Sequence, residues 1–379
     1  MKVLIVVTHL LGTGHLHRAV MLARGFAAAG HQARVISGGT QVRGLATEGI
    51  GLMQLPPLKS DGTRFTALLT EDGMAAPQSY LAMRQDRLLD ALAEAQPDVL
   101  ITELFPFGRR VLAPEFTALL QAALAQDAPP LILCSIRDIL APPSKPGKAA
   151  ATEELIARLY DGVLVHSDAT ATPLSISWPV SDLLAGKLHY TGFVAPSPPG
   201  PHPDQAGTGE VLVSAGGGAV GAPLFQAARE AARRTPELTW RILAGGTDPV
   251  PLIKALRQNA PANLIAEAAR PDFRQMLSHA ACSVSMAGYN TAMDLMQTGC
   301  PALLIPFDDG GEVEQSLRAK SLAHLPGIEA IRSVALTPEG LAKAVRRLAV
   351  TPRRATGTVA MNGVSETVRI TETLRNARR

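Results

Sequence analysis

The sequence predicts an α/β protein built of two Rossmann-like domains, whose parallel sheets face each other across an interdomain cleft. Short runs rich in Val, Ile and Leu alternate with Ala-rich amphipathic stretches, a pattern typical of parallel sheets covered by helices. The 379 residues are too many for one core and about right for two domains. Both halves begin in the same way, with an apolar strand, a glycine-rich turn and a helix.

The individual elements follow this alternation along the chain. The predicted strands are the apolar runs Val3–Thr8, Val99–Thr102, Leu131–Ser135, Val163–His166, Val211–Ser214, Arg241–Leu243, Ser283–Met286 and Ala302–Ile305. The predicted helices are His17–Ala29, Tyr80–Ala95, Leu224–Arg233, Asp272–His279, Ala292–Thr298, Glu314–Leu322 and Glu366–Asn376. Because helices separate the strands, we expect right-handed crossovers between parallel strands.

A segment dense in Pro and Gly separates the two halves. It reads APSPPGPHPDQAGTGE over residues 195–210 and is almost free of apolar residues. We therefore predict a first domain at 1–195, a linker at 196–209 and a second domain at 210–360. The remaining helix, 361–379, is long enough to pack back on the first domain.

Composition excludes several classes of protein. With 46% hydrophobic and 18% charged residues, the chain can bury large cores and is not a disordered segment. The aromatic content of 4% and the net charge of +3 argue against a nucleic-acid partner and still permit a local basic patch. The cysteines, Cys134, Cys282 and Cys300, are scattered, which is typical of buried free thiols in a reducing cytosol. No Cys/His spacing suggests a metal site.

The N-terminal run MKVLIVVTHLLGTGH predicts a first strand. It does not fit a signal peptide, because a Gly-Thr-Gly turn interrupts it and no cleavage site follows. No stretch approaches the roughly 18 apolar residues of a membrane span. We therefore expect a cytoplasmic protein, or at most one that is peripheral to a membrane.

Glycine-rich corners at strand ends are the candidate binding elements, since open α/β sheets bind ligands beyond the carboxyl ends of their strands. The corner SAGGGAVGAP contains G-x-G-x-x-G at Gly216, Gly218 and Gly221. Glycines let backbone N–H groups approach a phosphate, and the N-terminus of the next helix attracts an anion. The acidic residue of a dinucleotide site is absent from the next strand end. The corner is therefore either a phosphate-binding loop or a plain tight turn.

His15 and Glu103 are the candidate catalytic residues. His15 lies where the first strand gives way to a helix, and an imidazole with a pKa of about 6.5 can take a proton from a hydroxyl at neutral pH. Its alternative role is to cap that helix. Glu103 follows another strand and has three open roles: it orients His15, binds acceptor hydroxyls or acts as the base itself. His9 is a second candidate for the base.

Further residues near these corners are candidates for binding an acceptor. They are Gly14, Phe107, Arg109 and Arg137. Arginines at strand ends suit a phosphate or a lipid headgroup. The alternatives are an ordinary solvated arginine and, for Arg137, an ion pair with the adjacent Asp138.

Three segments of the second half resemble a known pattern in order and spacing. They are GYNTAMD from Gly288, GCPALLIPF from Gly299, and the pair Glu314–Gln315. Together they resemble the donor-binding segment of GT-B glycosyltransferases, and most of all glycosyltransferase family 28, the MurG-like group of bacteria. The likeness covers about the last third of the chain. The glycine loop and a histidine after a glycine turn extend it to the whole chain.

The resemblance implies a role for each matching residue. Asn290 and Thr291, at a helix start, would touch the donor diphosphate, and Asp294, one turn on, would take the ribose hydroxyls. Glu314 and Gln315 would bind the hydroxyls of the transferred sugar. The implied donor-binding set is Ser214, Gly216, Gly217, Gly218, Ala269, Arg270, Met286, Gly288, Asn290, Thr291, Asp294, Glu314 and Gln315.

Two departures from the family pattern concern the diphosphate and metals. Met286 occupies the position where many relatives have a histidine that contacts the diphosphate. Diphosphate binding would therefore depend more strongly on Ser214 and its glycine loop. A longer loop carries Asp308 and Asp309 before the Glu-Gln pair. Adjacent acidic residues suggest a metal, but the family pattern needs none, because helix N-termini neutralise the leaving diphosphate.

The implied function is inverting, metal-independent transfer of a sugar from a nucleotide-diphosphate sugar, preferentially a UDP-sugar, to an acceptor hydroxyl, without a cofactor. The acceptor is a lipid, a glycan or a small molecule. The alternatives are a nucleotide-sugar hydrolase or epimerase on the same scaffold, and a non-catalytic nucleotide-sugar-binding protein. Contact with the inner face of the plasma membrane would use a basic rim of Arg43, Lys59, Arg64, Arg109 and Arg110.

Overall fold

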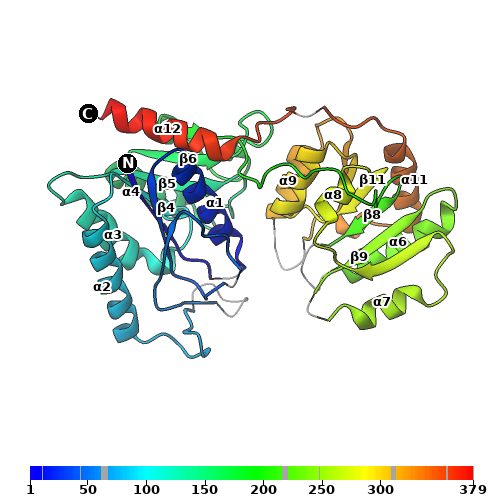
Figure 1. Cartoon of the computed structure of the whole chain (residues 1–379), viewed down its shortest axis with the longest axis horizontal. Coiled ribbons are helices and arrows are strands. Elements are labelled where there is room, and N and C mark those ends of the chain that lie inside the picture. Colours follow the sequence, from blue (N-terminus) through cyan, green and yellow to red (C-terminus); the bar gives the residue numbers. More distant parts are fainter. Residues whose placement is uncertain are drawn as a thin grey trace. The chain divides into compact units, whose positions relative to one another are not determined.

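The computed structural model describes residues 1–10, 12–42, 44–60, 67–215, 221–246, 248–308, 313–355 and 357–378. The chain forms two compact units (Figure 1). Unit 1 comprises Met1–Ala169, Pro173–Pro196 and Ala360–Arg379. Unit 2 comprises Thr170–Thr172 and Ser197–Val359. Each unit is an α/β structure with one parallel sheet, which confirms the predicted fold class.

In its described part, unit 1 contains seven parallel strands in the order β3-β2-β1-β4-β5-β6-β7. The strands are β1 (Lys2–Val7), β2 (Gln32–Ser37), β3 (Gly51–Gln54), β4 (Val99–Glu103), β5 (Leu131–Arg137), β6 (Gly162–His166) and β7 (Leu188–Tyr190). The helices are α1 (Gly14–Ala28), α2 (Gln78–Ala95), α3 (Ala113–Leu124), α4 (Pro146–Leu159), α5 (Asp182–Ala185) and α12 (Gly363–Ala377), with short 3-10 turns η1 (Arg110–Leu112) and η2 (Leu174–Ile176).

Helices cover both faces of this sheet, which is why its central strands are apolar throughout. In β4, Leu100 belongs to the core formed with α2, α3 and α4. Its neighbour Ile101 points to the opposite face and belongs to the core formed with α1 and α12. Alternation along the strand therefore places Glu103, two residues after Ile101, on the α1 face at the carboxyl end of β4.

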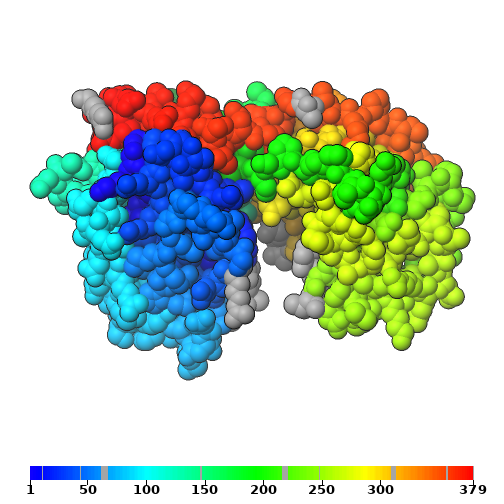
Figure 2. All heavy atoms as spheres, viewed as in Figure 1, coloured from blue at the N-terminus to red at the C-terminus, as the bar shows by residue number. Residues whose placement is uncertain are grey.

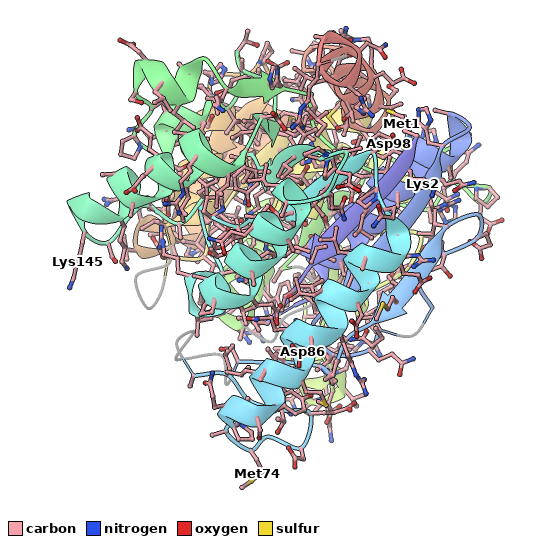
Figure 3. All side chains as sticks on the ribbon, turned by 90° about the vertical axis from the view of Figure 1, so that its left-hand side faces the viewer. Met1, Lys2, Met74, Asp86, Asp98 and Lys145 are labelled. Carbon is pink, nitrogen blue, oxygen red and sulfur yellow. The ribbon has the colours of Figure 1, made fainter. Side chains whose placement is uncertain are left out.

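The C-terminal helix α12 is part of unit 1 and packs against α1. In Figure 2 its atoms (red) lie beside those of the N-terminal segment (blue). The helices approach closely, because a Cβ atom added at Gly25 would overlap the side chain of Val364. Two contacts join α12 to the rest of the unit: a hydrogen bond of 2.9 Å between His31 and Glu372, and an ion pair of 3.2 Å between Arg375 and Asp98. Figure 3 labels Asp98 together with the nearby Met1 and Lys2.

In its described part, unit 2 contains six parallel strands in the order β10-β9-β8-β11-β12-β13. The strands are β8 (Val211–Ser214), β9 (Trp240–Ala244), β10 (Leu264–Ala268), β11 (Cys282–Ser285), β12 (Ala302–Leu304) and β13 (Ile328–Ala330). The helices are α6 (Ala222–Arg234), α7 (Val250–Arg257), α8 (Phe273–Leu277), α9 (Tyr289–Thr298), α10 (Glu314–Leu322) and α11 (Pro338–Ala349), with the 3-10 turn η4 (Ser333–Ala335).

The segment 196–209, which we predicted to be a linker, packs on unit 2 from Ser197 onward. His202 is buried and its Nε2 lies 3.0 Å from a carboxylate oxygen of Asp272. The backbone N–H of Gly209 donates to the carbonyl of His279 at 3.0 Å. A buried histidine among prolines therefore fixes a segment whose composition alone is typical of a spacer.

Candidate active site

His15 lies in the first turn of α1, just beyond the carboxyl end of β1. The helix begins at Gly14, and Thr13 at its N-cap supplies no side-chain cap. Only 13% of the His15 side chain is exposed, and its Nδ1 lies 2.8 Å from Oε1 of Glu103. The two predicted catalytic residues are therefore in direct contact within unit 1.

Glu103 is the last residue of β4, and its carboxylate is held from several sides. Its side chain is 1% exposed and forms an ion pair with Arg18, which lies three residues after His15 on the same face of α1. Ser135, at the facing position of β5, donates its hydroxyl to Oε2 of Glu103 at 2.6 Å. Burial alone would raise the pKa of Glu103, but the Arg18 charge and the hydrogen bonds hold that pKa well below its usual range. Glu103 is therefore a permanent carboxylate.

His15 is neutral at physiological pH. Burial disfavours the imidazolium and lowers the pKa of His15 to about 4, although Glu103 opposes this shift. A carboxylate accepts only, so Nδ1 of His15 carries the proton that is donated to Glu103. With that proton in place, the 3.1 Å approach of Arg18 to Nδ1 is a contact between two donors. The tautomer leaves the lone pair of Nε2 as a proton acceptor.

A second histidine, His166, is joined to Glu103 through Ser135. Nε2 of His166, the last residue of β6, lies 2.9 Å from Oγ of Ser135. Its Nδ1 lies 2.9 Å from the hydroxyl of Thr191. His166 is fully buried, and burial lowers its pKa to about 3. Our sequence analysis missed Arg18, Ser135 and His166 as site residues, although all three lie at helix or strand positions that point to Glu103.

The predicted acceptor residues differ in their surroundings. A Cβ atom added at Gly14 would meet no heavy atom within 4 Å, so the space above the start of α1 is open. Arg109 donates from Nε to the carbonyl of Thr8 at 2.6 Å, and burial lowers its pKa to about 10, so it stays charged. Arg137 donates from Nε to the carbonyl of Ile139 at 3.1 Å. Both arginines contribute to the positive charge around Glu103 and His15.

Phe107, the remaining residue predicted to bind an acceptor, has apolar surroundings. Its side chain is buried in the core of unit 1 and packs edge-on against Trp178, with ring centroids 5.1 Å apart. An aromatic residue in a loop after a strand fits either role by sequence, and the apolar neighbours decide for the core. His9 is also buried, and neither of its ring nitrogens has a hydrogen-bond partner among the described residues.

In unit 2 the corner after β11 forms an open helix N-terminus. Gly288 is the N-cap of α9, and as a glycine it has no side chain with which to cap the helix. Asn290 is exposed and Thr291 is half-buried in its first turn. Uncapped N–H groups and the helix dipole attract an anion at this end. The corner that resembles a diphosphate site thus has the required backbone arrangement.

Arg318, another residue that sequence reasoning missed, fastens this corner to α10. It is fully buried and donates from Nη1 to the carbonyl of Ala287 at 2.9 Å. Its Nη2 donates to Glu314 at 2.9 Å. Its guanidinium lies over the ring of Tyr289, 5.6 Å from the centroid. The guanidinium of Arg318 therefore holds both the corner and Glu314 in position.

Asp294 is engaged by a residue that the sequence did not predict. Arg274 on α8 donates from Nε to Oδ1 of Asp294 at 2.5 Å, and from Nη2 to Gln297 at 2.7 Å. Burial raises the pKa of Asp294, and the charge of Arg274 opposes that shift. Within the described residues, Oδ2 of Asp294 has no hydrogen-bond partner. That oxygen is what Asp294 can offer to a ligand.

Other predicted donor-binding residues have partners of their own. Gln315 accepts a hydrogen bond from the N–H of Phe307 at 3.1 Å. Met286 is half-buried against the core of unit 2. Ser214 is buried at the end of β8, where its hydroxyl has no partner in the described part of the chain. Gly216, Gly217 and Gly218 lie outside the described residues.

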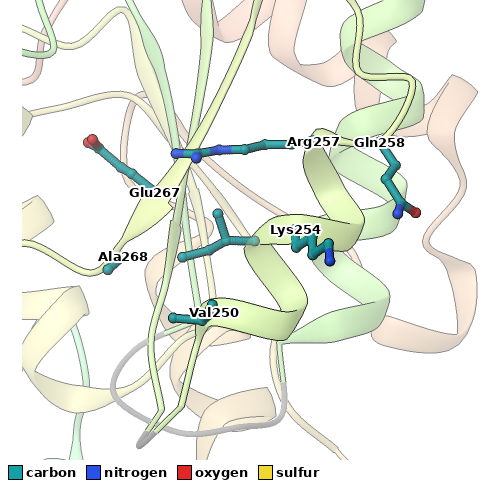
Figure 4. Close-up of a pocket in the computed structure, with 7 residues that line it drawn as sticks. Val250, Lys254, Arg257, Gln258, Glu267 and Ala268 are labelled. Atoms are coloured by element: carbon teal, nitrogen blue, oxygen red, sulfur yellow. The ribbon is translucent and has the colours of Figure 1, made fainter.

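Two more residues of the predicted donor-binding set, Ala269 and Arg270, follow β10. The N–H of Ala269 donates to the carbonyl of Ala244 at 2.8 Å, and Arg270 donates to Asp272 at 2.8 and 2.5 Å. Ala268 lines a pocket of about 530 Å³ between α7 and β10 (Figure 4). The other lining residues are Val250, Ile253, Lys254, Arg257, Gln258 and Glu267.

The structure also bears on metals and membranes. Among the residues that it describes, no three His, Cys, Asp or Glu side chains gather closely enough to hold a metal ion. Asp308 accepts a hydrogen bond from Ser333, and Asp309 lies outside the described residues, as do Arg43 and Arg64 of the basic rim. No helix in the described part of the chain combines the length and apolar character of a membrane span.

Comparison with known proteins finds one family model and several solved structures that resemble this chain. Residues 216–373 match the family model of the glycosyltransferase family 28 C-terminal domain. No curated protein sequence matches the chain. Among solved structures, MurG of Acinetobacter baumannii matches with a TM-score of 0.65 at 17% identity, over 98% of this chain and 100% of that one. The glycosyltransferase VinC in complex with dTDP matches with a TM-score of 0.65 at 14% identity, over 100% of both chains.

A third solved structure, the glycotransferase of kitacinnamycin, matches with a TM-score of 0.61 at 18% identity, over 99% of this chain and 95% of that one. Identities this low establish the fold alone, and the fold is that of GT-B glycosyltransferases. Together with the family model, they confirm the resemblance that the sequence indicated.

Proposed function

We propose that this chain, whose residues 216–373 match the family model of the glycosyltransferase family 28 C-terminal domain, is a glycosyltransferase that moves a sugar from a nucleoside-diphosphate sugar to an acceptor hydroxyl with inversion. The observation that carries the finer proposal is the contact of 2.8 Å between His15 and Glu103. A neutral imidazole held by a permanent carboxylate is the arrangement that a general base requires.

In the proposed reaction the acceptor hydroxyl donates a hydrogen bond to Nε2 of His15. As the acceptor oxygen attacks the anomeric carbon, its proton passes to Nε2 and the bond from that carbon to the diphosphate breaks. Attack opposite the leaving group inverts the configuration. The imidazolium formed on His15 is stabilised by Glu103, which remains ionised throughout.

Unit 2 supplies the donor-binding groups in this proposal. The uncapped N-terminus of α9 would meet the diphosphate through the N–H groups of Asn290 and Thr291. The N-terminus of α6, whose N-cap Gly221 also makes no side-chain cap, would meet it from the β8 corner. These dipoles would neutralise the leaving diphosphate without a metal ion. Asp294 would bind a ribose hydroxyl through Oδ2.

The nucleoside of the donor is proposed to be a pyrimidine. The sequence resemblance favours uridine. The solved structures of VinC and of the rhamnosyltransferase SpnG contain dTDP and thymidine diphosphate, respectively. UDP and dTDP differ at the base methyl group and at the 2′-hydroxyl, which dTDP lacks. A hydrogen bond from the 2′-hydroxyl to Asp294 would therefore favour UDP.

The proposal is tested by incubating the protein with UDP- and dTDP-sugars, with and without a panel of hydroxyl acceptors, and measuring the nucleoside diphosphate released. We expect release that requires an acceptor and persists in EDTA. His15→Ala should lower kcat by about 10²–10⁴-fold, the usual contribution of a general base. His17→Ala, at an exposed histidine two residues away, is the matched control and should leave kcat unchanged.

The other outcomes distinguish the alternatives. Release without any acceptor would indicate a hydrolase. Binding of a nucleotide sugar without turnover would indicate a binding protein. Unchanged turnover in both His15→Ala and Glu103→Ala would remove the pair from the mechanism.

A further inference from the structure

A continuous chain of hydrogen bonds runs from the end of β7 to His15. It passes through Thr191, His166, Ser135 and Glu103, and each of its links measures between 2.6 and 2.9 Å. All of its members except His15 are almost completely buried in unit 1. The carboxyl ends of β4, β5 and β6 bring them together, because Glu103 and Ser135 hold facing positions in the parallel register.

The direction of every link follows from what each group can donate. Glu103 is a carboxylate and only accepts, so the single hydroxyl proton of Ser135 points to Oε2 of Glu103. Ser135 has no second proton, and therefore Nε2 of His166 must donate to Oγ of Ser135.

The remaining link concerns the other side of His166. With its proton on Nε2, a neutral His166 presents a lone pair at Nδ1, and the hydroxyl of Thr191 donates to it. The carbonyl of Gly192, 2.8 Å from the same hydroxyl, is the nearer of two competing acceptors, and the carbonyl of Val165 lies at 3.4 Å. Donation to Gly192 would leave two lone pairs facing each other, or would require a buried imidazolium. Burial disfavours the charged ring, so the chain points one way, from Thr191 to Glu103.

The chain has a consequence for His15. Oε1 of Glu103 receives both His15 and Arg18, whereas Ser135 is the donor to Oε2. A carboxylate with a donor on each oxygen cannot rotate without losing one of them. The orientation of Oε1 in turn decides which ring nitrogen of His15 carries the proton. The charged groups around His15 are Arg18 on α1, Glu103 on β4 and Arg137 on β5, and those around His166 are Arg18 and Glu103.

We propose that Ser135 and His166 are positioning residues that fix Glu103 and thereby hold His15 in the tautomer whose Nε2 accepts a proton. Neither residue touches a reacting atom in this proposal. Its catalytic part rests on the proposed function, whereas the hydrogen-bond chain itself does not. Buried polar groups are costly unless they are hydrogen-bonded, and the hydrogen bonds of Ser135 and His166 lead to Glu103 and so to the base.

The tautomer of His15 can be measured without any substrate. In protein labelled with ¹⁵N at histidine, the ring nitrogens report which of them is protonated, and the His15→Gln variant assigns the signals of His15. We expect a single tautomer with the proton on Nδ1 in the unmodified protein. In Ser135→Ala we expect a mixture of tautomers. Ser37→Ala is the matched control, because Ser37 is an equally buried serine of the same sheet whose hydroxyl has no partner within the described residues.

Two variants of His166 separate positioning from packing. His166→Gln keeps an amide N–H near the place of Nε2, so the tautomer of His15 should be retained. His166→Leu fills the site without a donor, so the mixture should appear. In transfer assays, Ser135→Ala and His166→Leu should lower kcat by up to about 100-fold, the loss that a misplacement of about 1 Å produces, with KM for the donor unchanged. His166→Gln should recover most of this loss.

The proposal is overturned if His15 carries its proton on Nε2 in the unmodified protein, a result that needs no variant to fold. It is also overturned if the signals of His15 are the same in folded Ser135→Ala and His166→Leu as in the unmodified protein. Absence of transfer with every nucleotide sugar would contradict the proposed function but not the positioning roles of Ser135 and His166. The tautomer measurement would still decide whether the chain acts on His15.

Discussion

Arg274 donates a hydrogen bond of 2.5 Å from Nε to Oδ1 of Asp294, and this contact joins α8 to α9. One carboxylate oxygen of the acidic residue that the family pattern assigns to the ribose is therefore already hydrogen-bonded within the protein. Arg274 also reaches Gln297 and the carbonyl of Ser197. It therefore sets the rotamer in which Asp294 presents Oδ2.

Arg274→Ala should weaken donor binding and make it pH-dependent. Without the arginine, burial acts on Asp294 unopposed, and its pKa rises further above its ordinary value. The carboxyl group then takes up a proton at a higher pH and loses strength as an acceptor. We expect the Kd of UDP or dTDP to increase by about tenfold, the effect of one charge-assisted hydrogen bond, measured by titration calorimetry between pH 5 and 8.

Arg347→Ala is the control for that experiment, since this arginine pairs with Glu329 on the exposed surface of the same unit. Its Kd should match that of the unmodified protein. If Asp294→Ala and Arg274→Ala both bind nucleoside diphosphates normally, Asp294 has no part in the donor site.

The acidic limb of the pH–rate profile should lie well below the usual range of histidine. Because the pKa of His15 is lowered to about 4, the neutral base persists until the pH falls below roughly 5. Glu103 raises the pKa of His15, so Glu103→Gln should shift the limb of kcat/KM to still lower pH while reducing the rate at every pH. A limb near pH 6.5 in the unmodified enzyme would show that His15 is not the group that titrates.

Substitution of Gly25 should loosen unit 1. A side chain at this position would overlap Val364, so α1 and α12 would have to separate. Gly25→Val should therefore lower the free energy of unfolding by about 1–3 kcal/mol, the usual cost of overpacking. Gly147→Ala in α4, where an added Cβ meets open space, should leave the stability unchanged or slightly higher. Thermal and urea denaturation give both values, and equal stability of the two variants would contradict the close approach.

Arg318→Lys should damage the α9 corner although it keeps the positive charge. A lysine cannot reproduce the separate hydrogen bonds to Ala287 and Glu314, and the loss of one such bond costs about 2 kcal/mol. We expect lower stability and weaker binding of nucleoside diphosphates. The matched control is Arg346→Lys, at an exposed arginine paired with Glu237. Equal binding by Arg318→Lys and Arg346→Lys would exclude a role for Arg318 in shaping the corner.

The sequence was sufficient to predict the central strands, and contact with His15 was one of the three roles that it left open for Glu103. Both residues follow apolar strands, and neighbouring parallel strands end at the same edge of a sheet. Their partners could not be predicted, because Ser135 and His166 end the strands that the sequence predicts and resemble ordinary strand ends. Only the register of the sheet places Ser135 opposite Glu103. Arg18 could have been predicted as a site residue from the sequence, because it lies one helical turn after His15 and so on the same face.

Strands with a mixed composition were also missed. QARVIS in β2 and GLMQ in β3 carry polar residues, and β3 lies at the edge of the sheet, where its side chains are largely exposed. The pairing of Arg274 with Asp294 joins residues twenty positions apart on different helices, and it depends on how α8 packs against α9. Local patterns contain no information about that packing.

Unit 1 takes its last helix from a part of the chain that follows all of unit 2. During synthesis on the ribosome, the sheet of unit 1 can form early, but its core on the α1 side stays incomplete until Val368 and Ile370 of α12 have been added. Unit 2 is nearly continuous and can complete itself in the meantime. Part of the apolar core of the N-terminal half therefore stays exposed until α12 emerges.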